Sequence, residues 1–361
     1  MSTVETASLA RPQRRLNIGL IIRIAIGILV TAFIAYRFYN VLAVKQIYGG
    51  DTWVRLAISG LIIGGVYAVI ALGYTLVYGI LFMINFAHGE IMMLGAFAGY
   101  FALEIMGAAG FSAQYPLPAI LITFIVGMLT SMLSGITLER IAYRPLRYAP
   151  RLVPLISAIG ASLFLQNAAQ LMFGSAKRAY LNPPILDRGQ GWTLMVSGQP
   201  VLITYTGVLT FLLSIVLMVG LQLLVQRTRM GRAMRAVAED KATAALMGIN
   251  VDRVIVNTFA VSGVLAGAAG VMWGLHNGII YHYIGFLPGI KAFTAAVLGG
   301  IGNVPGAMLG GIFLGVVESV APAVLDINFQ LKDVIAFTIL VLVLIFRPTG
   351  LLGEVLSEKK V

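Results

Sequence analysis

Long apolar stretches recur along the whole sequence and are separated by short polar segments. A helix of about 20 apolar residues is long enough to cross a hydrocarbon layer about 30 Å thick. We therefore expect an all-α polytopic membrane protein with about 8–10 transmembrane helices, one or two of them broken or re-entrant. The expected spans are roughly 17–36, 53–79, 83–106, 117–141, 152–174, 201–226, 254–275, 286–303, 304–322 and 331–347.

The eighth and ninth expected spans are short and are divided by the segment GGIGNVPGAMLGG. One interpretation is a tight turn in which Asn303 caps the next helix and Pro305 occupies its first position. The other is a pair of half-helices whose ends line a pathway, because irregular backbone within lipid is tolerated where it lines a cavity. Under the second interpretation, the candidate gating residues are Gly299, Gly300, Gly302, Asn303, Pro305 and Gly306.

Composition agrees with a membrane protein, since 59% of residues are hydrophobic and 11% are charged, against about 25% charged in soluble domains. The net charge of +11 does not indicate nucleic acid, because 17 of the 25 Lys and Arg residues fall in segments on one side of the expected topology. The positive-inside rule then places both termini in the cytoplasm. We expect a cytoplasmic tail and an extra first span in residues 1–50, and the permease domain in 51–361.

The segment MINFAHGEIMM places Asn85, His88 and Glu90 between apolar stretches. If it lies near the inner membrane face, Asn85 is the N-cap of the third span and Glu90 lies in its first turn. Alternatively, the three residues contribute to coupling or line a translocation path. A proton relay is disfavoured, because Glu104 and Glu318 lie near predicted outer ends and His276 and His282 fall in an outer loop, far from His88. No Arg or Lys is evident at the centre of a span.

Motifs for catalysis and metal binding are absent from the sequence. It has no GxSxG, no HExxH, no cysteine and no His/Asp/Glu cluster with ligand spacing. It also lacks the GxxxxGK[ST] loop that binds the phosphates of ATP. We therefore expect a protein that is not an enzyme and that binds neither a metal nor a cofactor itself.

The inner loop 227–253 has the pattern of a short amphipathic helix. Four residues at helical spacing form an apolar face: Ala233, Val237, Ala244 and Met247. Gly248 is placed to end this helix and Asn250 to cap the next span. The helix either lies at the membrane interface or docks into a groove of a cytoplasmic partner. The residues that would make this coupling contact are Arg232, Arg235, Glu239, Asp240, Ala244, Met247 and Gly248.

Several long segments, in this order, resemble one transporter family. They include GGVYAVIALGYTLVYGILFMINFAHGE (64–90), ERIAYRPLR (139–147), MGRAMRAVAEDKATAALMGINVDRV (230–254) and RPTGLLG (347–353). They are similar to the Liv-type permease subunit of high-affinity branched-chain amino acid ABC importers. The first 50 residues match less well. The nine-residue spacing from Glu239 to Gly248 also departs from the six residues of the general importer pattern.

This resemblance implies a bacterial inner-membrane complex. Its expected partners are a second, related permease subunit, two cytoplasmic ATPases that use ATP and Mg, and an extracytoplasmic amino-acid-binding protein. The expected substrates are leucine, isoleucine and valine, moved by alternating access. The same importer class for urea, short amides or other amino acids is the alternative, and an ion-coupled secondary transporter is a more distant one.

Overall fold

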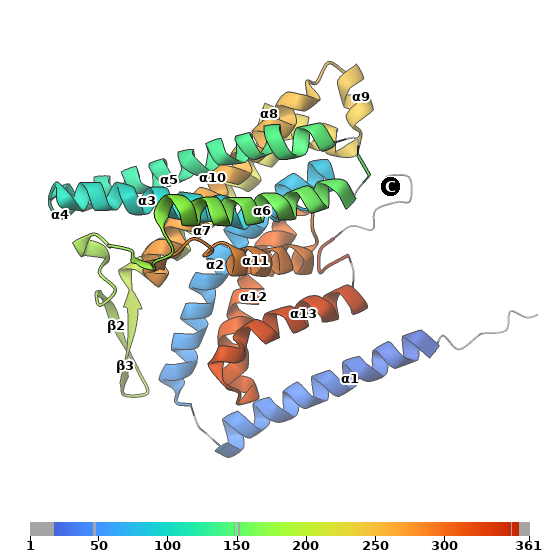
Figure 1. Ribbon diagram of the computed structural model, residues 1–361. Coiled ribbons are helices and arrows are strands. Elements are labelled where there is room, and N and C mark those ends of the chain that lie inside the picture. Colours follow the sequence, from blue (N-terminus) through green and yellow to red (C-terminus); the bar gives the residue numbers. More distant parts are fainter. Residues whose placement is uncertain (1–17, 46–47, 148, 151, 348, 354–361) are drawn as a thin grey trace, which may run out of the picture.

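The computed structural model describes residues 18–45, 48–147, 149–150, 152–347 and 349–353, and these residues form an almost entirely helical chain (Figure 1). The helices are α1 (Ile18–Tyr39), α2 (Gly50–Leu81), α3 (His88–Ala108), α4 (Phe111–Gln114), α5 (Pro116–Leu138), α6 (Leu152–Phe173), α7 (Tyr205–Arg227), α8 (Arg229–Glu239), α9 (Lys241–Leu246), α10 (Val251–Asn277), α11 (Phe286–Gly299), α12 (Val304–Leu325) and α13 (Lys332–Phe346). Short π-helical or 3₁₀ turns occupy Asn40–Lys45, Glu139–Tyr143, Arg144–Leu146, Pro184–Leu186 and Phe329–Leu331.

Two small antiparallel sheets are the other regular structure of the described chain. The hairpin joins β2 (Gly191–Val196) to β3 (Gln199–Thr204) with Gly191 opposite Thr204. The second sheet pairs β1 (Arg178–Ala179) with β4 (Ile279–Ile280). Both sheets lie in the loops between spans.

Each of the ten expected spans overlaps one helix, and eight helices within the described residues are long and apolar enough to cross a membrane. The helix α11 has 14 residues and is therefore about 21 Å long, too short to cross the hydrocarbon layer. The fold class predicted from the sequence, a polytopic helical membrane protein with a broken or re-entrant span, is confirmed. The helix α1 lies where the extra first span was predicted.

The helices α2 and α10 form the centre of the bundle, and most of their residues are buried. Glycine allows α2 to approach α12 closely: a Cβ placed on Gly315 would lie 2.2 Å from the Cα of Gly64. Small residues commonly permit such contacts between helices in membranes. Helices α5, α6 and α7 form the outside, where large apolar side chains such as Phe164 and Leu171 are exposed as expected of a surface in lipid.

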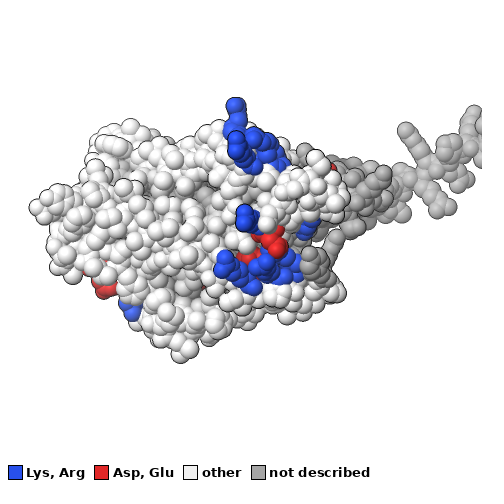
Figure 2. Space-filling model, turned by 90° about the horizontal axis from the view of Figure 1, so that it is seen from above, with Lys and Arg blue, Asp and Glu red and all other residues white. Residues whose placement is uncertain are grey.

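The two ends of the bundle differ in what they carry. In Figure 1 the α8–α9 element, the Ile18 end of α1 and the Phe346 end of α13 lie toward one end, and the β2–β3 hairpin and α4 lie toward the other. Figure 2 shows that Lys and Arg side chains gather toward the end that carries α8 and α9, with acidic side chains among them. The helices therefore connect a strongly charged end with an end made of loops and the hairpin.

Candidate functional site

The segment between α2 and α3 folds back into the bundle. Helix α2 ends at Leu81, and Phe82 adopts a left-handed conformation with φ 55° that reverses the chain. Helix α3 then begins at His88, whose ring packs edge-on against Tyr74 with centroids 4.8 Å apart. The Nδ1 atom of His88 lies 3.3 Å from the Ser262 hydroxyl, which donates a 3.1 Å hydrogen bond to the carbonyl of Gly73.

This polar cluster lies near the middle of α10 and not at its end. Ser262 comes 11 residues after Val251, the first residue of α10, and is therefore about 16 Å from that end of the helix. The membrane depth of the trio stays a prediction, but the structure places His88 well inside the bundle. The reason is the length of α2: its 32 residues extend about 48 Å, so Gly73 and Tyr74 lie well before its end and the next segment returns to their level.

Asn85 is not the N-cap of α3, which corrects the sequence prediction. The cap position is Ala87 and makes no side-chain capping bond. The Asn85 Oδ1 atom instead accepts a 2.9 Å hydrogen bond from the hydroxyl of Tyr143, at the end of the π-helical turn after α5. Asn85 therefore ties the returning segment to the α5 end, while Glu90 does lie in the first turn of α3, as predicted.

Glu90 is buried, with 1% of its surface exposed. Its Oε1 atom accepts hydrogen bonds from Gln166 Nε2 at 2.8 Å and from the Ser162 hydroxyl at 3.3 Å, both on α6. Its Oε2 atom has no hydrogen-bond partner among the described residues. Burying a carboxylate oxygen without a donor is costly, so this oxygen is a candidate contact for a ligand.

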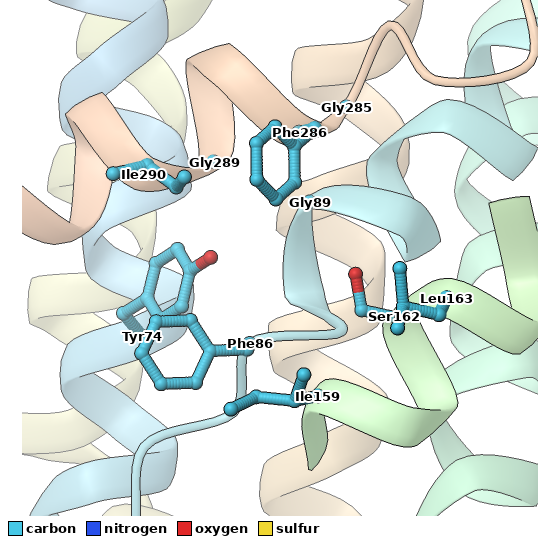
Figure 3. Close-up of a pocket in the computed structure, with 10 residues that line it drawn as sticks. All are labelled: Tyr74, Phe86, Gly89, Ile159, Ser162, Leu163, Gly285, Phe286, Gly289 and Ile290. Carbon is cyan, nitrogen blue, oxygen red and sulfur yellow. The ribbon is translucent and has the colours of Figure 1, made fainter.

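A small cavity of about 70 Å³ lies between α2, α3, α6 and α11 (Figure 3), and Ser162, which donates to Glu90, is among the residues that line it. Its walls combine aromatic and aliphatic side chains with two hydroxyl groups and three glycines: Tyr74, Phe86, Gly89, Ile159, Ser162, Leu163, Gly285, Phe286, Gly289 and Ile290. The first turns of α3 and α11 meet there, since a Cβ placed on Gly289 would lie 3.1 Å from the Cα of Gly89. Glycine is required at this crossing because a side chain would separate the two helices.

The Gly-rich segment after α11 forms a tight turn. Gly300 and Gly302 have φ values of 105° and 96°, and Asn303 caps α12 by accepting a 3.1 Å hydrogen bond from the Gly306 N–H group. Pro305 lies in the first turn, one position later than predicted. The tight-turn interpretation is therefore confirmed, while the length of α11 also makes it a half-helix.

The C-terminal segment covers this turn. The N–H groups of Leu351 and Leu352 donate to the carbonyls of Leu298 and Gly299, at 2.7 and 3.0 Å. The six candidate gating residues of the turn are not among the residues that line the cavity between α2, α3, α6 and α11. Their role in gating stays a prediction.

The inner loop forms two helices where one was predicted. Asp240 has an extended backbone, with φ −155° and ψ 113°, and separates α8 from α9. Its Oδ1 atom accepts hydrogen bonds from the N–H groups of Ala242 and Thr243 at 2.8 and 3.1 Å, and its Oδ2 atom accepts one from the Thr243 hydroxyl at 2.7 Å. These bonds, led by that of the Thr243 hydroxyl, hold the pKa of the Asp240 carboxyl below its usual value. Asp240 was expected to contact a partner, but in this structure it is the N-cap of α9.

The apolar face of this loop also differs from the prediction. The buried residues are Gly231, Met234, Val237 and Ala244. Met247, which was expected on the same apolar face as Val237 and Ala244, is instead 78% exposed and stands beside Leu246, which is 88% exposed. The break at Asp240 shifts the helical register, so a face predicted for one continuous helix does not continue through α9.

The predicted ends of this loop are correct. Gly248, with φ 84°, follows Met247, the C-cap of α9, and Asn250 caps α10 through a 2.9 Å bond from the Arg253 N–H group. Arg232, Arg235 and Glu239 are exposed, and Arg235 donates a 2.6 Å hydrogen bond to the carbonyl of Val225, the residue two before the end of α7.

An ion-pair cluster within the bundle was missed from the sequence. The Nζ atom of Lys291 on α11 lies 2.8 Å from Glu318 Oε1 on α12 and 2.5 Å from Asp333 Oδ1 on α13. Lys332 Nζ lies 3.7 Å from the same Glu318 oxygen. The sequence indicated no Arg or Lys at the centre of a span, and neither Lys291, the sixth residue of α11, nor its pairing with acidic residues was singled out. The available signal was Lys291 itself, an isolated charge in an apolar segment.

Comparison with known proteins gives the family. The family model described as branched-chain amino acid transport system / permease component matches residues 56–344. The chain belongs to this permease family. Within it, the chain is 47% identical over 307 residues to the high-affinity branched-chain amino acid transport system permease protein BraD of Pseudomonas aeruginosa, covering 85% of this chain and 98% of BraD.

Other relatives support the same assignment. The corresponding permease protein LivH of Escherichia coli is 44% identical over 302 residues, with 83% of this chain and 96% of LivH covered. The autoinducer 2 import system permease protein LsrC of Yersinia enterocolitica is 33% identical over 140 residues, which cover 37% of this chain and 39% of LsrC. No solved structure matches the chain significantly. The chain is thus a multi-pass transport permease and not an enzyme.

Proposed function

We propose that the chain is the permease subunit of an ABC importer that moves leucine, isoleucine and valine across the bacterial inner membrane. Separate ATPase subunits dock on α8 and α9, bind ATP and Mg, and drive alternating access. A second, related permease subunit and an extracytoplasmic binding protein complete the complex. The substrate follows the printed names of relatives with 44–47% identity over most of this chain.

The observation that carries this proposal is the construction of the α8–α9 element. Its N-terminal part is fixed to the bundle: Thr228 caps α8, and Met234 and Val237 are buried in the core. Its far part instead presents Leu246 and Met247 to the surroundings. Large exposed apolar side chains on a charged surface are typical of a docking contact.

The connections of this element suit the transfer of motion. Helix α8 directly follows α7 and packs against α7, α10 and α2, and α9 leads into α10. At the same end, Arg147 contacts both Glu139 at the end of α5 and Asp252 in the first turn of α10. A partner that pulls on α9 would therefore move α7, α10 and α5 together.

The charge distribution gives the orientation in this proposal. The α8–α9 end and the described ends of α1 and α13 lie on one side of the bundle (Figure 1), where the basic residues gather (Figure 2). By the positive-inside rule we assign this side to the cytoplasm. This orientation puts α8 and α9 where ATPases would be, and both termini on the same side.

A paired substitution tests the docking assignment. Replacing Leu246 and Met247 together by Ser should abolish co-purification of the ATPases and ATP-dependent leucine uptake by reconstituted vesicles, because neither side chain is needed in the core. The matched control replaces Leu194 and Met195, another exposed Leu–Met pair, on the hairpin at the other end. If the ATPases bind the L246S/M247S protein as well as they bind the control, the docking assignment is wrong.

Two further measurements separate the alternatives. Unlabelled isoleucine and valine should compete with leucine uptake by the wild-type complex, whereas urea and acetamide should not; the reverse result would reject the branched-chain assignment. The ion pair of Lys291 and Glu318 makes a secondary transporter worth testing directly. Uptake should require ATP and persist when a protonophore collapses the proton gradient.

A further inference from the structure

The segment that follows α5, residues 139–147, turns one of its faces into the bundle. It winds first as a π-helical turn and then as a 3₁₀ turn, and such departures from the α-helix often mark functional positions. Glu139, Tyr143 and Arg147 follow one another at intervals of four residues. Glu139 and Tyr143 are fully buried and the Arg147 side chain is 10% exposed, whereas Ile141 is 73% exposed. The three inward side chains therefore form one buried row.

Arg147 joins this row to the start of α10. Its guanidinium group contacts the buried Glu139, and its Nη1 atom lies 2.5 Å from Asp252 Oδ1. Asp252 is the second residue of α10 and comes six residues after Leu246, where α9 ends. Arg144 also contacts Asp252, at 3.0 Å, but no ion pair joins it to Glu139 within the described part of the chain. Arg147 is therefore the residue that connects the first turn of α10 with a buried carboxylate.

Tyr143 joins the same row to the segment that precedes α3. Its hydroxyl donates a 2.9 Å hydrogen bond to Asn85 Oδ1, three residues before the start of α3. Asn85 is 2% exposed, and its Nδ2 atom has no hydrogen-bond partner among the described residues. The Tyr143 ring also packs against Phe259 of α10, with centroids 5.3 Å apart. The position of the Asn85 side chain therefore depends on the hydroxyl of Tyr143.

From these contacts we propose that residues 139–147 relay motion from the α8–α9 element to the segment before α3, and that Arg147 and Tyr143 are the positioning residues of this relay. Arg147 holds the segment on the start of α10, and Tyr143 passes its displacement to Asn85. This inference rests on the proposed function, from which the docking of ATPases on α8 and α9 is taken.

Burial is the reason that these contacts transmit motion. Asp252 is 54% exposed, so water can replace a lost partner there, but Glu139 is fully buried. A buried charge or amide left without a partner is costly. When the start of α10 is displaced, Glu139 therefore keeps Arg147, and Asn85 keeps the hydroxyl of Tyr143. The segment moves as a unit and carries the Asn85 side chain with it.

Removing the Tyr143 hydroxyl tests the far end of the relay. In vesicles that contain the full complex, Y143F should bind the ATPases and hydrolyse ATP like the wild type. The leucine taken up per ATP hydrolysed should fall roughly three- to tenfold, as expected for the loss of one hydrogen bond. The control is Y100F, the same chemical change at a tyrosine whose hydroxyl donates a 3.1 Å hydrogen bond to Glu104; its uptake per ATP should not change.

Substitution of Asp252 by Asn tests the near end. D252N leaves the ion pair between Arg147 and the buried Glu139 in place and should also lower leucine uptake per ATP. The control R144Q removes the other partner of Asp252 and should couple like the wild type. The double variant Y143F/D252N should be no worse than the worse single variant, because both changes interrupt one relay. Effects that multiply, or wild-type uptake per ATP in Y143F, would overturn the proposal.

A second readout distinguishes a relay from a structural role. The chain has no cysteine, so Met83→Cys places a single thiol in the segment before α3. Maleimide labelling of this thiol in the complex should change when ATP and vanadate trap the ATPases, and D252N should abolish the change. A variant that only loosened the fold would alter labelling equally with and without ATP.

The outcomes separate this inference from the proposed function. Labelling of M83C that does not respond to ATP, or that responds equally in D252N, shows that the relay is wrong. If the wild-type complex takes up leucine with ATP, the proposed function stands whatever these variants do. If it does not, the proposed function itself fails.

Discussion

Removing the lysine of the buried ion-pair cluster should destabilise the bundle. Lys291 joins Glu318 and Asp333, and so holds α11 to α12 and α13 through side chains on three helices. The side chains of Lys291 and Glu318 are only 6% and 3% exposed. The substitution Lys291→Met therefore leaves a buried carboxylate without its nearest positive charge.

The size of the effect follows from this geometry. Breaking a buried ion pair by removing one partner costs about 3–5 kcal/mol, because the remaining charge is uncompensated. Two features favour the lower end of this range: Asp333 is 36% exposed, and Lys332 lies 3.7 Å from Glu318. We expect the free energy of unfolding of K291M to fall by about 3 kcal/mol.

A double substitution identifies the cause of the loss. Replacing Lys291 and Glu318 together by Met removes both charges and keeps apolar bulk, and such replacements are often neutral or stabilising. K291M/E318M should therefore be more stable than K291M alone, in spite of carrying one more substitution. The measurement is the SDS-induced unfolding of the purified permease followed by circular dichroism.

The matched control is Lys332→Met, because Lys332 is 48% exposed and makes only the longer contact. Surface pairs contribute about 0–1 kcal/mol, so K332M should lose no more than this. The reasoning is refuted if K291M is as stable as K332M, or if the double variant is less stable than K291M.

Two other predictions concern the break between α8 and α9 and the contact between α2 and α12. The pKa of Asp240 in the folded protein lies below the ordinary 3.8, so its cap on α9 should be present in full above pH 3.8 and disappear as the pH falls through the lowered pKa. Hydrogen exchange of the α9 amides should be faster in D240A than in D240N at neutral pH, and equal rates would contradict the cap. Gly315→Leu should prevent the close approach of α12 to Gly64 on α2 and greatly reduce the yield of folded permease. The control Gly160→Leu, on α6, should be tolerated because an added Cβ there meets no atom within 4 Å. Similar yields of the two variants would show that the α2–α12 contact is not tight.

Hydrophobic pattern was sufficient for the fold, because apolar length alone selects a helix in lipid. It placed ten helices and the ends of the inner loop, where Gly248 and Asn250 have strong local preferences. It failed at Asp240, because the same side chain can lie on the surface of a helix or cap the next one. The choice depends on the positions of the hydrogen-bond donors of Thr243 and its neighbours, and hydrophobic periodicity carries no information about these positions.

The position of His88 within the bundle was the main feature that the sequence did not predict. A hydropathy pattern places a residue by its distance along the chain from the end of the nearest span. His88 follows the end of α2 by only seven positions, which suggests a position near that end. Its actual position, however, is set by which atoms pack against the returning segment, here Gly73 on α2 and Ser262 on α10. These contacts join residues 174 and 189 positions apart, and no local pattern encodes them.

The same physical reasoning connects the small cavity with the charged cluster behind it. Helix α11 presents Gly289 and Ile290 to the cavity and, one residue later, Lys291 to the acids of α12 and α13. A helix as short as α11 needs its position fixed by contacts with its neighbours. The ion pairs can supply this fixation, since they add charge interactions in a low-dielectric region to apolar packing. On this view K291M should impair leucine uptake even in those molecules that remain folded, because α11 would lose its defined position relative to α12 and α13.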